Sequence, residues 1–594
     1  MKTHRVANLV FILILLSYCI YAGLFIYRTS FAVEGKTYFA LFDDAMISMR
    51  YARNLAHGYG PVWNPGGERV EGYTNPLWVL VMAVFHLLPV PARQVSLLVQ
   101  VSAALLLVAN LFFVKKVAEL ASGKSAFVAL ASVFLTAFYL PLNTWSLQGM
   151  EVAALLPLTS LALWFALKSI DQGRFSPWPY ILLGIGTLLR IDMAVPYLAL
   201  LVYFLAIDRQ NRGRNLAAGL GILCGFLALQ TLFRIWYYGD PLPNTYYLKM
   251  TGYPTFLRLT RGLYVTLDFA WNLNWLLLLV PLGVALFWRD RRLLILPWLF
   301  LAQIAYSVYV GGDAWEWWGG ANRYVCLGIP ALFVFGACVM DHCLLRIPYR
   351  VVRGAWCVSS PHESSSGSSS PQPPNVAQRE SLPEPGNPGH PSMRDTEHAP
   401  RTTHCASRIT FHASRLTFDI PRLTHCLLRI ALVALALITL TNFDALYSRQ
   451  SLAEWLLIRR PLHVTDNRKM VQSALILDRI TTPEARVAVP FAGVLPYFLE
   501  RETIDLLGKN DRHIARTPMR VASGYLKYIS FYPGHMKWDY AYAIGQLKPD
   551  VITGLWYAPE EAEPYLKEYR QVEIGGFTFY LREGSDRIRW DSIQ

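Results

Sequence analysis

Long apolar runs recur along most of this chain, and they constrain its fold more than any other feature. The first begins near residue 7 and the last ends near residue 441. A helix needs about 20 apolar residues to cross the hydrocarbon core of a bilayer. Hydrophobic residues make up 54% of the 594 positions and charged residues only 16%, whereas about a quarter of an average soluble protein is charged. We therefore predict an all-α polytopic membrane bundle and exclude a soluble multidomain enzyme.

About eleven of these runs are expected to span the membrane, although some are shorter than the others. They lie near residues 7–27, 94–114, 125–141, 152–168, 178–190, 193–207, 216–237, 273–288, 293–310, 323–342 and 427–441. A further run at 77–90 is apolar but short, and it is interpreted as a juxtamembrane helix.

The positions of the basic residues indicate how these spans are oriented. The net charge of +14 would suggest a nucleic-acid partner in a soluble protein. Here the basic residues stand in short turns between apolar runs, such as Lys115–Lys116, Arg209–Arg214 and Arg289–Arg292. If the 77–90 run stays outside the bilayer core, these turns share the side of the N-terminus, which the positive-inside rule makes cytoplasmic. The prediction is a multi-pass protein of the cell membrane (inner or plasma) that contacts the lipid bilayer and no nucleic acid.

In this orientation most of the polar sequence lies on the outer side. The outer segments are residues 28–93, 142–151, 238–272, 311–322 and the chain after about 442. Residues 1–354 are expected to form the main transmembrane module, with 28–93 as its first outer loop. Residues 355–425 are rich in Ser and Pro and cannot bury a core, so they are predicted to be a disordered cytoplasmic insert. A last transmembrane helix is expected at 426–444.

The tail, residues 445–594, has a different pattern. Short segments of β-type sequence occur at 486–490, 503–507, 550–554 and 577–582, with a helical stretch between the first two. This alternation predicts a small α/β domain on the outer side of the membrane.

The densest polar signal lies in the first outer loop. Asp43 and Asp44 open a helical stretch, and helical spacing places Arg50 two turns from Asp43 on the same face. A carboxylate beside cations suits a reaction that deprotonates a hydroxyl and expels a phosphate. The alternative is that one of the acids only caps the helix. Function is favoured, because paired acids at a membrane interface are costly without a role.

The sequence of this loop is also the most specific string in the chain. It runs Asp43-Asp-Ala-Met-Ile-Ser-Met-Arg-Tyr-Ala-Arg-Asn-Leu55 and continues as Gly67-Glu-Arg-Val-Glu-Gly-Tyr-Thr-Asn-Pro-Leu-Trp78. It resembles the membrane glycosyltransferases of the GT-C fold, and most of all the mycobacterial terminal β-1,2-arabinofuranosyltransferases and their bacterial relatives. Supporting blocks lie at 145–151, 189–192, 238–249, 311–313, 492–497 and 505–511.

The resemblance implies a multi-span bundle with a catalytic first outer loop and a C-terminal outer domain. It implies transfer of a sugar, expected to be arabinofuranose, from a polyprenyl-phosphate donor to a cell-envelope glycan acceptor on the outer face. Asp43 or Asp44 is expected to be the general base, with the other acid orienting it. Alternatively, both acids help to hold Mg²⁺, Mn²⁺ or Ca²⁺, which prefer oxygen ligands.

Further site residues are expected at the outer helix ends and turns. The candidates to bind the donor phosphate are Arg50, Arg190, Lys249 and Arg323. Arginine suits phosphate best through bidentate contacts, although snorkelling to lipid headgroups is an equal alternative for the last three. The candidates to bind substrate are Glu71, Tyr73, Asn75, Glu151, Asp240, Asn244 and Asp313. Turn stabilisation competes with this role at Glu71, and a favourable helix-dipole contact competes at Glu151.

Two departures and three other functions also have to be weighed. The 355–425 insert is foreign to the family pattern, and Lys509 stands where the resemblance leads us to expect an apolar residue. A transferase of the same fold that uses a polyprenyl-phosphate hexose is one alternative. A polytopic lipid or glycan transporter is another, but we see no internal repeat with paired broken helices. A non-catalytic assembly protein would make Asp43 and Asp44 replaceable.

Overall fold

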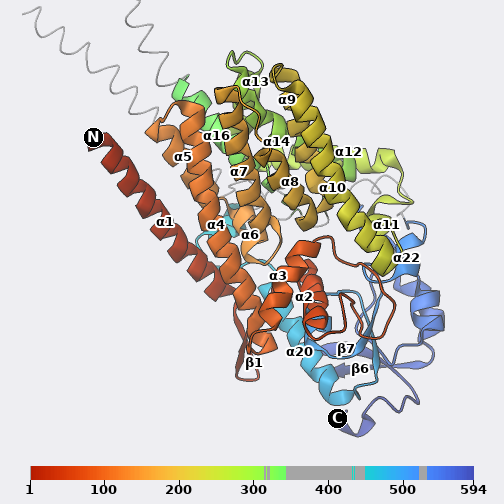
Figure 1. Ribbon diagram of the computed structural model, residues 1–594. Coiled ribbons are helices and arrows are strands. Elements are labelled where there is room, and N and C mark those ends of the chain that lie inside the picture. Colours follow the sequence, from red (N-terminus) through yellow and green to blue (C-terminus); the bar gives the residue numbers. More distant parts are fainter. Residues whose placement is uncertain are drawn as a thin grey trace, which may run out of the picture. The chain divides into compact units, whose positions relative to one another are not determined.

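The computed structural model describes residues 2–273, 275–313, 316, 322–342, 448–520 and 531–593, together with 431 and 434 (Figure 1). The described tail packs with residues 2–341 as one compact unit. The predicted insert at 355–425 lies outside the described residues, and so does the predicted last span at 426–444 apart from residues 431 and 434.

Five helices in the described residues are long and apolar enough to cross a membrane. They are α1 (Lys2–Thr29), α4 (Ala92–Ser122), α7 (Val152–Gln172), α10 (Arg212–Tyr238) and α14 (Ile295–Val310), the last extended by the 3₁₀ turn η2 (Arg291–Leu294). Two bent pairs raise the number to at most seven if each pair is one span. One pair is α5 (Ala126–Ala137) with α6 (Leu140–Leu147), bent by 53°, and the other is α12 (Thr255–Asn272) with α13 (Trp275–Ala285), bent by 107°.

Several predicted spans form shorter apolar helices. These are α8 (Trp178–Leu189), α9 (Ala194–Ile207) after the 3₁₀ turn η1 (Ile191–Met193), and α16 (Ile329–Met340) after the single turn α15 (Arg323–Cys326). The helix α8 stops because Arg190 adopts an extended conformation, with φ −158° and ψ 127°. Length and composition therefore confirm a multi-pass membrane protein but not a count of eleven spans.

The first outer loop contains a hairpin and two helices. Strands β1 (Phe31–Val33) and β2 (Lys36–Tyr38) pair antiparallel, and α2 (Asp43–Ala56) and α3 (Pro76–His86) follow. Asp43 and Asp44 occupy the first turn of α2, where negative charge favours a helix N-terminus. The short helix α3 matches the expected juxtamembrane run, and Pro76 at its first position suits a helix start. The outer segment 238–272 contributes α11 (Asn244–Met250) ahead of α12.

The tail carries a five-stranded mixed sheet of order β4-β3-β5-β7-β6. Its strands are β3 (Arg486–Val489), β4 (Glu502–Asp505), β5 (Val551–Ile552), β6 (Tyr569–Ile574) and β7 (Phe577–Arg582). The described helical elements beside them are α19 (Ser448–Trp455), α20 (Val464–Ile480), α21 (Val494–Phe498), α22 (Arg512–Arg516), η5 (Ala541–Gln546), η6 (Pro559–Glu561), α23 (Glu563–Leu566) and η7 (Trp590–Ser592). Strand β3 is parallel to β4 and β5, and β7 is antiparallel to its two neighbours. All four expected strands are present, whereas the exposed edge strand β6 was not predicted.

The first outer loop is bound to the tail through buried hydrogen bonds. Arg50 of α2 donates to the carbonyl oxygens of Pro496 and Arg501 at 2.5 and 2.9 Å. The amide of Asn467 in α20 donates to the carbonyl oxygen of Leu41 at 2.9 Å. These bonds fix the N-terminal end of α2 against the segment around α21, which positions the site described next.

Candidate active site

A small open cavity of about 40 Å³ lies where the first outer loop meets the tail. It is lined by Asp44, Ile47, Ser48, Gly72, Tyr73, Thr74, Asn75, Met150, Thr245, Lys249, Arg323 and Lys509. Five of the residues expected from the sequence are therefore brought together here: one acid of the pair, two of the cations and two substrate candidates. Lys509 was not predicted as a site residue.

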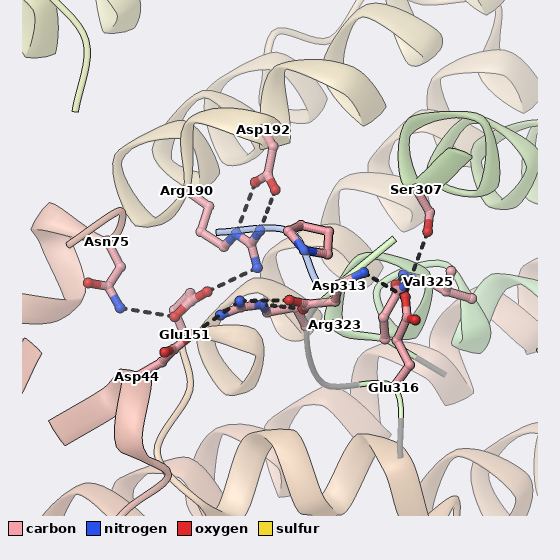
Figure 2. A network of polar contacts seen from close by, with 12 residues as sticks. Asp44, Asn75, Glu151, Arg190, Asp192, Ser307, Asp313, Glu316, Arg323 and Val325 are labelled. Atoms are coloured by element: carbon pink, nitrogen blue, oxygen red, sulfur yellow. Dashed lines mark hydrogen bonds and ion pairs between the residues drawn. The ribbon is translucent and has the colours of Figure 1, made fainter. Parts of the chain in front are cut away.

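Asp44 presents its carboxylate to this cavity between cationic side chains. Its Oδ1 lies 2.5 Å from the ammonium of Lys509, and its Oδ2 lies 3.2 Å from the guanidinium of Arg323. Figure 2 shows Asp44 pointing toward Arg323 and its neighbours. Burial alone would raise the pKa of Asp44, but Lys509, Arg323 and Lys249 together hold that pKa well below its usual range. Asp44 is therefore a carboxylate in the absence of substrate.

Asp43 has different surroundings, although it is the next residue. Its Oδ1 accepts a hydrogen bond of 2.8 Å from the backbone N–H of Val494, at the start of α21. Burial raises the pKa of Asp43 to about 6, while Lys509 and the N–H of Val494 act in the opposite direction. Asp43 does not line the cavity, so the structure assigns the two acids to different contacts: Asp43 holds the tail and Asp44 faces the site.

The two predicted cations of the cavity differ in how firmly they are held. Arg323 makes two hydrogen bonds to the buried carboxylate of Asp313, at 2.6 and 3.0 Å, and Figure 2 shows this paired geometry. Lys249 has no hydrogen-bond partner for its ammonium among the residues that the structure describes. Burial and the nearby Arg323 lower the pKa of Lys249 to about 8, despite Asp313 and Asp44. Lys249 is thus a cation whose donors are still available to a ligand.

Lys509 enters the site from the loop after β4. The carboxylate of Asp505 accepts hydrogen bonds from the backbone N–H groups of Leu507, Gly508 and Asn510, which closes the loop tightly. Asn244 of α11 donates to the carbonyl oxygens of Gly508 and Lys509 from the other side. The predicted substrate ligand Asn244 is therefore a support for the loop. The departure from the expected apolar residue at 509 was the only sequence signal of this cation.

A second polar network lies beside the first. Asn75 accepts a hydrogen bond from Ser48 and donates one of 2.9 Å to Glu151. Glu151 in turn pairs with Arg190 at 3.1 Å, and Arg190 also pairs with Asp192 (Figure 2). Arg190 is thereby held between two carboxylates and does not line the cavity. The network orients Asn75, which does line it.

Four further predicted residues are not brought into the cavity. The guanidinium of Arg50 is fully used by carbonyl oxygens and by Asn64. Glu71 forms a buried ion pair of 2.7 Å with Arg234 of α10, which the sequence did not suggest. Asp240 pairs with Arg512 and Arg516 of the tail. Asp313 is buried and bound to Arg323, and it does not line the cavity.

The described residues do not suit a divalent cation held between Asp43 and Asp44. They contain no group of three or more His, Cys, Asp or Glu side chains that could hold a metal ion. Each oxygen of Asp44 already faces a cationic side chain, and Asp43 is turned toward the backbone of α21. The cation hypothesis therefore stays a prediction, and no chemical step is assigned to a metal here.

Comparisons with known proteins bear on this site and on the fold. A family model described as a domain of unknown function, DUF8728, matches residues 459–587 of the tail. The terminal β-(1→2)-arabinofuranosyltransferase of Mycobacterium tuberculosis (strain ATCC 25618 / H37Rv) is 27% identical over 215 residues. That match spans about a third of either chain, namely 34% of each.

The fold is similar to a solved membrane-enzyme structure along almost the whole chain. The crystal structure of ArnT from Cupriavidus metallidurans bound to undecaprenyl phosphate aligns with a TM-score of 0.50 at 11% identity. The alignment covers 97% of this chain and 98% of ArnT. The apo structure of the same protein aligns with a TM-score of 0.48. The chain therefore has the GT-C fold of the membrane glycosyltransferases that its first outer loop resembles.

Proposed function

We propose that this protein is a membrane glycosyltransferase that moves a sugar from a polyprenyl phosphate to a glycan acceptor on the outer face of the cell membrane. One observation carries the proposal: a single carboxylate, Asp44, faces a cavity in which buried cations are in excess. The likeness in fold to ArnT, whose structure contains undecaprenyl phosphate, and the partial match to an arabinofuranosyltransferase support it.

The charges of the cavity match those of such a donor. Of the side chains that line the cavity, Lys249, Arg323 and Lys509 are cationic and Asp44 alone is anionic, while Asp313 and Asp43 stand behind them. A sugar linked to a polyprenyl chain through a phosphodiester carries one negative charge. The donor phosphate therefore meets more cations than anions on the cavity wall, and Lys249 supplies hydrogen-bond donors that no described residue uses.

The chemical step follows from this placement. Asp44 takes the proton of the acceptor hydroxyl as the acceptor oxygen forms a bond to the anomeric carbon of the sugar. The bond between that carbon and the phosphate oxygen breaks, and its electron pair leaves on the polyprenyl phosphate. Lys249 and Arg323 stabilise the charge that develops there. A direct displacement of this kind with one base favours inversion at the anomeric carbon.

Arabinofuranose is the proposed sugar, because the sequence match is to an arabinofuranosyltransferase. Tyr73, Asn75 and Ser48 line the cavity beside Asp44. They are the proposed contacts for the hydroxyl groups of the arabinofuranose. A polyprenyl-phosphate hexose remains the second candidate for the donor, since the fold alone does not select the sugar.

Transfer by the detergent-purified full-length protein tests the proposal. Synthetic polyprenyl-phosphoarabinose is offered with an arabinan oligosaccharide, and polyprenyl-phosphohexoses are offered in parallel. We expect an arabinose-extended product and release of polyprenyl phosphate in equal amounts. Transfer only from the hexose donors would overturn the sugar assignment, and no transfer or binding of any donor by folded protein would overturn the proposed function.

A further inference from the structure

Lys509 combines a fixed backbone with a side chain that has one hydrogen-bond partner. Its loop is held by Asp505 on one side and by Asn244 on the other. Among the described residues, the only group that bonds to its ammonium is Oδ1 of Asp44, at 2.5 Å. The lysine chain is flexible and ends in three donors. Rotation of this side chain therefore changes its partner without moving the loop.

Arg323, the other cation on Asp44, lacks this freedom. Its guanidinium makes two hydrogen bonds to Asp313, and the same Nη2 atom that reaches Asp313 also reaches Asp44. The two bonds to Asp313 hold this buried guanidinium in place beside Asp44. Lys509 is therefore the cation on Asp44 that can turn away with no other hydrogen bond to break, although its ion pair is the shorter of the two.

These contacts create a conflict for a general base. A carboxylate whose two oxygens both face cations accepts a proton poorly, because protonation would give up both ion pairs. One cation has to leave before Asp44 can take the acceptor proton. Phosphate oxygens form strong charge-assisted hydrogen bonds with lysine, so the incoming donor phosphate can replace Asp44 as the partner of a lysine.

We propose that Lys509 moves from Asp44 to the donor phosphate when the donor binds, so that Asp44 becomes an available base only in a donor-occupied site. This inference rests on the proposed function and adds a tail residue to it. Lys509 then binds the phosphate together with Lys249, which lines the same cavity. Binding of the donor thereby precedes deprotonation of the acceptor.

The charge balance of the chemical step agrees with this order. The proton that reaches Asp44 adds one positive charge to the group of Lys249, Arg323, Lys509, Asp44 and Asp313. At the same time the phosphodiester becomes a phosphate monoester dianion, which adds one negative charge. The two changes cancel, and the phosphate remains the partner of Lys509 until it leaves.

Equilibrium binding of undecaprenyl phosphate to the full-length protein in lipid nanodiscs is the first test. Lys509→Met should weaken binding about tenfold or more, because it removes a positive charge beside the phosphate and leaves the Asp44 carboxylate facing it. Lys509→Arg should bind within about threefold of the wild type, since it keeps the charge. Lys548→Met, on the exposed surface of the tail, is the matched control and should bind like the wild type. Equal binding by Lys509→Met and the wild type would overturn the inference.

The same assay separates the two hypotheses. A wild-type protein that does not bind undecaprenyl phosphate would contradict the proposed function itself. A wild type that binds, beside a Lys509→Met protein that binds equally, would contradict only the role of Lys509. If Lys509→Met does not fold, the Lys509→Arg protein and the structure of the wild-type complex decide.

The structure of the undecaprenyl phosphate complex and the kinetics complete the test. In the complex the Lys509 ammonium should lie about 3 Å from a phosphate oxygen and no longer within hydrogen-bond distance of Asp44. In transfer assays, Lys509→Met should raise the KM for the donor about tenfold and lower kcat by less than about threefold, because its Asp44 is already released. A purely structural lysine would remain on Asp44 in the complex, and its loss would leave the KM unchanged; either result would overturn the inference.

Discussion

Gly493 lies against the backbone of Asp43 so closely that a Cβ atom on the glycine would stand 2.0 Å from the Asp43 carbonyl oxygen. The contact joins the start of α2, beside the candidate base, to the start of α21 in the tail. The same junction includes the hydrogen bond from Val494 to Asp43. The position of Asp44 thus depends on a close backbone approach between segments far apart in sequence.

Gly493→Ala is expected to loosen this junction. The new Cβ meets backbone atoms, which cannot move aside as a side chain can, so we expect a loss of stability of about 1–3 kcal/mol, toward the upper end. Thermal unfolding of the purified protein and proteolysis of the tail measure the effect. Gly221→Ala in α10 is the control, since no atom lies within 4 Å of its added Cβ. Equal stability of the two variants would contradict the tight junction.

Arg323 and Arg190 are expected to respond differently to loss of charge. Arg323→Gln removes a cation that lines the cavity, so the donor KM of the folded protein should rise about tenfold or more, and stability should fall as well because Asp313 loses its partner. Arg190→Gln leaves Glu151 and Asp192 without their shared cation, so the main effect should be a loss of stability of about 3–5 kcal/mol. The folded fraction of the Arg190 variant should keep the wild-type KM. A larger change of KM in the Arg190 variant than in the Arg323 variant would show that Arg190, and not Arg323, binds the phosphate.

The pH dependence of kcat/KM for the donor is expected to follow the ionisation of Lys249. Its pKa is lowered to about 8 by burial and by Arg323, so the ammonium is charged below that pH and neutral above it. The value of kcat/KM for the donor should therefore fall as the pH rises through about 8, since this parameter reports the free enzyme. Lys249→Arg stays charged and should lose this fall while it retains activity. A fall at the same pH in both proteins would point to another group.

The sequence predicted the place of the site better than its contacts. The apolar runs and basic turns placed Asp43, Asp44, Lys249 and Arg323 on one side of the membrane, because these patterns are local. The sequence did not separate Asp43 from Asp44, since the choice depends on α21, which begins at residue 494. Lys509 was missed as a site residue for the same reason: 465 positions separate it from Asp44.

The sequence also could not tell which of the predicted arginines face the site. Arg190 has the same local signature as Arg323, namely an arginine at the outer end of a helix, and Arg50 was expected on the helix face of Asp43. Only the fold reveals that carbonyl oxygens occupy Arg50 and that Glu151, 39 positions away, neutralises Arg190. A count of eleven spans was not confirmed because several apolar runs form helices of ten to seventeen residues.

Sugar transfer by Asp44→Asn and Asp43→Asn proteins, beside the wild type, tests the central claim most directly. Asn at 44 cannot take a proton, so we expect transfer to fall by about 10²–10⁴-fold with the protein still folded and the donor still bound. Asn at 43 keeps a side-chain oxygen for the N–H of Val494, so it should retain most of the activity. Activity that survives in Asp44→Asn, or that collapses in folded Asp43→Asn alone, would contradict the assignment of Asp44 as the base.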